Sequence, residues 1–108
     1  MSSISNNTSY LKPPECPFQE AYGRSLGSIE GDDIHKRVIR LFEDKKFGEG
    51  VETALSFKSK FAKGNSLLLA IQKYSGHYDT IIPALQKMPD LTKFDKELKE
   101  YLIYEAKP

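Results

Sequence analysis

Two amphipathic segments flank residues 47–50 (Phe-Gly-Glu-Gly), whose two glycines we predict to form a hinge, and they constrain the fold more than any other part of the chain. In the first segment, apolar residues recur at the three- and four-residue spacing of one helix face. Its apolar positions are Ile34, Val38, Leu41 and Phe42. An aspartate at position 32 or 33 is placed to cap the start of this face. We therefore predict a helix over residues 32–46, ended by Gly48 in a left-handed conformation.

The same kind of spacing recurs through the rest of the chain, interrupted by glycine, asparagine and proline. Residues 64–65 (Gly-Asn) are expected to break one helix, after which Ser66 caps the next. Pro83 is expected in a first helical turn, where backbone N–H groups have no intrahelical partner. Helices are predicted over residues 51–62, 67–75, 80–88 and 92–106, with a possible short one over residues 17–26.

The chain is therefore expected to be all-α, a small irregular bundle of four to five short helices with an extended N-terminal arm. Its 108 residues suffice for a single domain, which we place at residues 18–108. Residues 1–17 form the predicted flexible arm, because its prolines favour extended backbone. The predicted core consists of Val38, Leu41, Phe42, Leu55, Leu68, Leu69, Ile71, Ile82, Leu85, Leu98 and Leu102.

Composition is that of an ordinary globular protein, with 39% hydrophobic and 29% charged residues. Cys16 is the only cysteine, so an intrachain disulfide is impossible. The first residues lack the basic and apolar regions of a secretory signal, and apolar runs are too short to span a bilayer. We expect a soluble, intracellular protein, most simply cytoplasmic, without a membrane partner.

Positive charge is concentrated in the middle of the chain. Residues 34–63 hold eight Lys or Arg against four Asp or Glu, although the whole chain sums to only +1. A basic face within residues 36–63 is typical of proteins that contact phosphates, so nucleic-acid binding is one alternative function. The helix after residues 64–65 is too apolar to read base edges. Candidate contact residues on this face are Lys36, Arg37, Arg40, Lys58 and Lys60.

Catalytic and cofactor motifs are largely missing from the sequence. The Gly-Glu-Gly of residues 48–50 lacks the third glycine and the preceding strand of a dinucleotide site. The two histidines, His35 and His77, have no zinc-ligand spacing, so we predict neither a metal nor a cofactor. In residues 77–79 (His-Tyr-Asp), an imidazole beside a carboxylate in a turn is the best chemical cluster, yet no nucleophile accompanies it. No catalytic residue is predicted.

One local resemblance lies across the two glycines. Residues 46–51 (Lys-Phe-Gly-Glu-Gly-Val), with Ala54, Leu55 and Phe57, resemble a stretch in the C-terminal domain of cyanase, the bicarbonate-dependent enzyme that degrades cyanate. The resemblance covers residues 46–57 and implies a small enzyme or ligand-binding domain. It places the catalytic serine of that family at Thr53, while the family's catalytic arginine and glutamate have no counterpart upstream.

The leading hypothesis is a non-enzymatic protein–protein interaction module, such as an adaptor, a regulatory subunit or a small component of a larger assembly. Tyrosines near element ends suit an interface, because their rings combine an apolar body with a polar tip. Tyr101 and Tyr104 are the candidate contacts of this kind. The expected partner is another protein or a second copy of the chain. Enzymatic activity is left open, and a non-enzymatic role is favoured.

Overall fold

Helices and turns make up the structure, a computed structural model that describes residues 14–18 and 29–107. Over those residues it contains no strand, so the predicted all-α class is confirmed. Residues 1–13 of the predicted arm, and most of the helix predicted over residues 17–26, lie outside the described residues. The elements are α3 (Asp33–Glu43), α4 (Phe47–Leu55), α5 (Lys60–Lys73), the 3₁₀ turn η1 (Ser75–His77), α6 (Tyr78–Gln86) and α7 (Lys93–Ala106).

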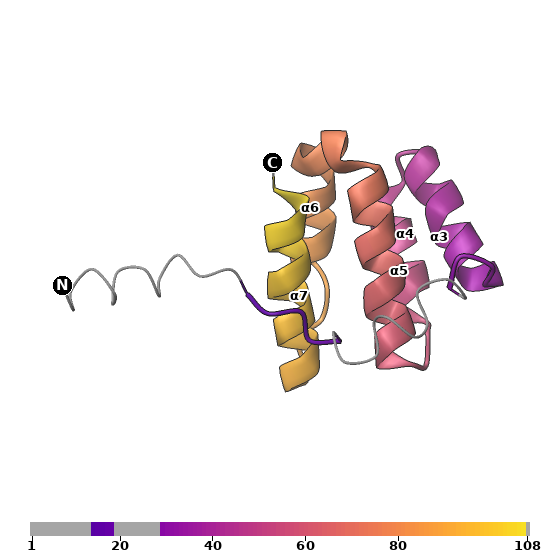
Figure 1. The fold of residues 1–108 in the computed structure, drawn as a ribbon. Helices are drawn as coiled ribbons and strands as arrows, with labels where there is room; N and C mark the ends of the chain where they lie inside the picture. Colours follow the sequence, from indigo (N-terminus) through magenta and orange to yellow (C-terminus); the bar gives the residue numbers. More distant parts are fainter. Residues whose placement is uncertain (1–13, 19–28, 108) are drawn as a thin grey trace.

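Helix α5 runs through the middle of the bundle (Figure 1). It packs against α7 on one side and against α3 and α4 on the other. Helices α4 and α6 also pack together, and they run in the same direction because α5 carries the chain back between them (Figure 1). The ring centroids of Phe47 and His77 are 5.8 Å apart, so the N-terminal ends of α4 and α6 lie side by side.

A single apolar core joins the helices. Seven of the predicted core residues are buried: Val38, Phe42, Leu68, Ile71, Leu85, Leu98 and Leu102. The other four, Leu41, Leu55, Leu69 and Ile82, are only half-buried, and for these the prediction was wrong. Leu69 is only half-buried because it lines a surface pocket with Ile39 and Lys73.

The connection between α3 and α4 differs from the predicted glycine hinge. Helix α3 starts at its Asp32 cap as expected, but it ends with Lys45 as the left-handed residue, at φ 62°. The amide of Lys46 donates to the Leu41 carbonyl and that of Lys45 to the Phe42 carbonyl, which is the Schellman pattern. Gly48, predicted as the terminator, instead lies in the first turn of α4.

The predicted helix break at residues 64–65 is also wrong. The actual break is the turn after Leu55, and Ser59 caps α5 by accepting from the amide of Ala62 at 3.2 Å. Helix α5 then continues through residues 64–66 because tertiary contacts use these small residues. A Cβ atom on Gly64 would collide with the ring of Phe18, so glycine here permits close packing rather than ending a helix.

Phe18 connects the N-terminal segment to this packing site. Its ring is 5% exposed and lies edge-on to Phe61 of α5 and Tyr101 of α7, with ring centroids 6.1 and 6.0 Å apart. Cys16 packs against the same core. Residues 14–18, which include the last part of the predicted arm, therefore lie against the helices.

The last two helices are close to expectation. Thr92 caps α7, its Oγ1 accepting from the Asp95 amide at 3.1 Å, so this helix starts where it was predicted to start. Helix α6 begins at Tyr78, so Pro83 is its sixth residue and not in the first turn as predicted. Within the described residues no helix is both long and apolar enough to cross a membrane.

Candidate functional site

A groove of about 690 Å³ lies between the parallel helices α4 and α6. Its α4 wall carries Gly48, Glu52 and Leu55, whose spacing of four and three residues places them on one side of the helix. Val51 and Met88 also line the groove, and they are only 3% and 4% exposed. The floor of the groove is therefore apolar and continuous with the core.

The α6 wall is a strip of mostly short side chains. Thr80, Pro83, Ala84 and Lys87 line the groove at the i, i+3, i+4, i+7 spacing of one helix face. Thr80 and Pro83 are exposed, and Ala84 is half-buried. Short side chains let a third helix approach closely, because the distance between packed helices depends on the residues at the contact.

Charged groups are distributed unevenly around this groove. Lys45 and Lys46 line it at the N-terminal end of α4, and Lys87 lines it at the C-terminal end of α6. The two lining carboxylates, Glu49 and Glu52, both belong to α4. Neither α4 nor α6 has a side-chain hydrogen bond capping its N-terminus. The end of the groove at which both helices start is therefore positive in both charge and helix dipole.

A second polar feature is buried between α3 and α5. His35 Nδ1 lies 2.7 Å from Ser66 Oγ, and these side chains are 4% and 0% exposed. The neighbouring Asn65 is also 0% exposed, and among the described residues neither polar atom of its amide has a hydrogen-bond partner. An unpaired buried amide costs about 1–3 kcal/mol, so this cluster is not optimised for stability.

His35 and Ser66 resemble a nucleophile–base pair but are not placed to act as one. His35 lines a pocket of about 440 Å³ with residues of α3, α5 and the preceding turn. Ser66, in contrast, lies fully buried in the interior of α5, where backbone N–H groups bond to carbonyls of the same helix. A substrate carbonyl therefore has no access to the hydroxyl. The pair therefore joins two helices.

Burial lowers the pKa of His35 below its ordinary value of 6.5, because desolvation disfavours the imidazolium. The carboxylates of Glu30 and Asp32 oppose this change, and Lys73 adds to it. The folded protein thus holds the ring in its neutral form more strongly than the unfolded chain does. Proton uptake at position 35 favours unfolding.

Stability is therefore expected to depend on pH through His35. Its contribution is complete above pH 6.5 and is lost as the pH falls below that value towards the lowered pKa. Urea denaturation between about pH 7.5 and 5 should show a falling free energy of unfolding in the wild type. The step should disappear in His35→Gln and persist in His77→Gln. Equal pH profiles for the wild type and His35→Gln would contradict the assignment.

The basic residues predicted on α3 are exposed but do not form an unbroken positive face. Lys36, Arg37 and Arg40 all project to solvent. At 100° per residue, the exposed Asp33 and Asp44 fall on the same side of the helix. A helix face that carries both acidic and basic residues attracts phosphates less strongly than the number of basic residues in the segment indicates.

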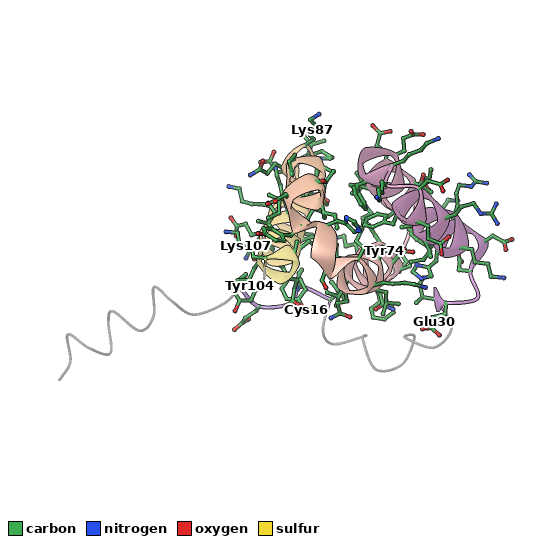
Figure 2. The ribbon with its side chains drawn as sticks, turned by 90° about the horizontal axis from the view of Figure 1, so that it is seen from above. Cys16, Glu30, Tyr74, Lys87, Tyr104 and Lys107 are labelled. Atoms are coloured by element: carbon green, nitrogen blue, oxygen red, sulfur yellow. The ribbon has the colours of Figure 1, made fainter. Side chains whose placement is uncertain are left out.

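The other predicted contact residues lie elsewhere. Lys58 is exposed in the turn between α4 and α5, and the Nζ of Lys60 lies 5.2 Å from the centroid of the Phe94 ring on α7. Tyr101 is half-buried in the cluster with Phe18, whereas Tyr104 is 47% exposed. Figures 1 and 2 show α7 and Tyr104 on the opposite side of α5 from α3. The structure does not gather the predicted residues into one site.

The cluster predicted at residues 77–79 is not a free turn. His77 ends η1, and Tyr78 and Asp79 open α6. The half-buried His77 ring lies against the Phe47 ring. This contact fixes the start of α4 beside the start of α6 and so positions one end of the groove.

Sequence reasoning missed the α4–α6 groove itself. The apolar face of the segment after Gly50 is wider than contact with one neighbour requires, and that width was the available signal. The pairing of α4 with α6 is a contact between non-consecutive helices, which helix spacing does not reveal.

Among the described residues, no three His, Cys, Asp or Glu side chains come together as a metal site. In comparisons with known proteins, no family model, no curated protein and no solved structure matches the chain. The resemblance to cyanase over residues 46–57 stays a local similarity of sequence. Thr53, the position of that family's serine, donates its hydroxyl to the Glu49 carbonyl one turn earlier in α4, at 2.8 Å.

Proposed function

We propose that this protein is a non-enzymatic interaction module, and that its α4–α6 groove takes up a short helical segment of a partner protein. The observation that carries the proposal is the groove, an apolar floor left open between two helix walls. Docking of an amphipathic helix into such a groove is a recurring mode of recognition between proteins.

The dimensions and exposed groups of the groove suit this mode. Helix α4 has nine residues and is therefore about 14 Å long, so an occupant would contact it over two to three turns. Pro83 and Leu55 retain apolar surface that a partner would remove from water, at about 25 cal/mol for each Å². Leu91, two residues beyond the lining residue Pro89, is also apolar and is 88% exposed.

A phage-displayed library of random peptides of about 15 residues, selected on the full chain, tests the proposal. A matched pair of variants locates the binding site. A Cβ atom added at Gly48 or at Gly76 would meet nothing within 4 Å, so both positions tolerate glutamine, but only Gly48 lines the groove. Gly48→Gln is expected to weaken selected peptides by about tenfold, or 1.4 kcal/mol.

The control, Gly76→Gln, should bind the same peptides with affinity within about twofold of the wild type, because η1 lies outside the groove. Enriched peptides that share apolar residues at three- and four-residue spacing would support helical docking. The proposal would be overturned if no peptide is enriched, or if the enriched peptides bind the Gly48→Gln variant as tightly as the wild type.

A further inference from the structure

We infer that the helix occupying the α4–α6 groove lies antiparallel to α4 and carries acidic side chains in its C-terminal turn, against Lys45 and Lys46. This inference rests on the function proposed above and assigns the chemistry and direction of the partner. It follows from the charge at the two ends of the groove and along its α4 wall.

The end of the groove at which α4 and α6 begin is complementary to a negative group. Lys45 and Lys46 are exposed there and line the groove. Both helix N-termini point to this end and lack a side-chain cap, although Glu49 and Asp79 in their first turns offset part of the positive dipole. The acidic Glu43 and Asp44 precede the lysines but do not line the groove.

Helix dipoles fix the direction of the occupant. The C-terminal end of an occupying helix is negative, and it is most stable beside the positive N-terminal ends of α4 and α6. Its positive N-terminal end then lies beside the carbonyl ends of the same two helices, where Lys87 lines the groove as a single cation, against Lys45 and Lys46 at the other end. Acidic side chains in the last turn of the partner would add ion pairs with Lys45 and Lys46.

The middle of the groove has the opposite preference. Glu52 lies one turn beyond Gly48 on the α4 wall, so a carboxylate facing it would be repelled. Lys87, the C-cap residue of α6, lies at the far end, which therefore has one lysine where the other end has two. The expected partner is therefore an amphipathic helix that is neutral or basic beside Glu52 and acidic in its C-terminal turn.

Synthetic, C-terminally amidated forms of the tightest peptide from the library provide the test. Amidation removes the terminal carboxylate, so only acidic side chains remain. The affinity for the Lys45→Gln/Lys46→Gln double variant should be about threefold to tenfold weaker than for the wild type. A double variant that removes the same charge from α3, Lys36→Gln/Arg37→Gln, should bind within about twofold of the wild type. Replacing the peptide's last-turn acids by their amides should weaken wild-type binding and leave the Lys45→Gln/Lys46→Gln affinity unchanged.

Direction is measured separately with a benzophenone photo-crosslinker at one end of the peptide. The C-terminal probe should label residues 45–48 and Thr80, and the N-terminal probe should label Leu55 and residues 87–89. The reverse labelling pattern would overturn this inference and leave the proposed function intact. The same holds if peptides bind in the groove with equal affinity for the wild type and for the Lys45→Gln/Lys46→Gln variant. Absence of any groove-binding peptide would overturn both.

Discussion

Replacing Phe42 by alanine is expected to lower the free energy of unfolding by about 3–5 kcal/mol. Its side chain is 0% exposed, and its ring centroid lies 5.2 Å from that of Phe47 and 6.1 Å from that of Tyr74. The one ring therefore holds α3 against both the start of α4 and the end of α5. Since a domain of this size is stable by about 5–15 kcal/mol, the loss is a large fraction of the total.

Urea denaturation followed by circular dichroism measures this change. Leu91→Ala is the control, because Leu91 is also a large apolar residue but is 88% exposed. It should change stability by no more than about 0.5 kcal/mol. A loss below about 1 kcal/mol in Phe42→Ala would show that the ring is not part of the core.

A second large effect is expected from Gly50→Ala. An added Cβ would lie 2.6 Å from Cδ1 and 2.7 Å from Cε1 of Phe42, which is too close for real atoms. Because Phe42 is enclosed by other rings, α4 has to shift away from α3, at a cost of about 1–3 kcal/mol. Thermal denaturation should show a melting temperature lower by roughly 4 °C or more for each kcal/mol.

The same helix supplies the control for this prediction. Gly48→Ala meets open space and removes the backbone freedom of glycine from the unfolded chain, so it should stabilise by about 0.4–1 kcal/mol. Phe42→Leu replaces the ring at this contact by a smaller side chain. The double variant Gly50→Ala/Phe42→Leu should therefore lose less free energy of unfolding than the sum of the losses in the two single variants. Strict additivity, or equal effects at positions 48 and 50, would contradict the proposed contact.

These two positions also show why part of the site was not predictable. Gly48 and Gly50 look alike in sequence, and both were interpreted as a hinge. In the structure one lies on an open wall of the groove and the other beneath the Phe42 ring. Gly64 is a further example, because its role depends on packing against Phe18, a residue far from it in the chain.

Local patterns were sufficient to predict two of the helix starts. The Asp32 and Thr92 caps mark the starts of α3 and α7, because each side chain bonds to an amide two or three residues away. Local patterns did not identify a single interaction site. The candidate lysines, arginines and tyrosines are distributed over α3, the α4–α5 turn, α5 and α7. Charge and residue type alone do not indicate which surfaces meet.

The sequence by itself determined that this protein is helical and determined which faces of most helices are apolar, since both follow from spacing of three and four residues. Tertiary structure alone decided that α5 continues through residues 64–66 and that α4 lies beside α6. The physical reason is that a glycine, a serine or a half-buried leucine has no fixed role until a neighbour from another part of the chain packs against it. The α4–α6 groove exists only through such a contact, and its α4 wall includes residues 47–49, where a break between two helices was predicted.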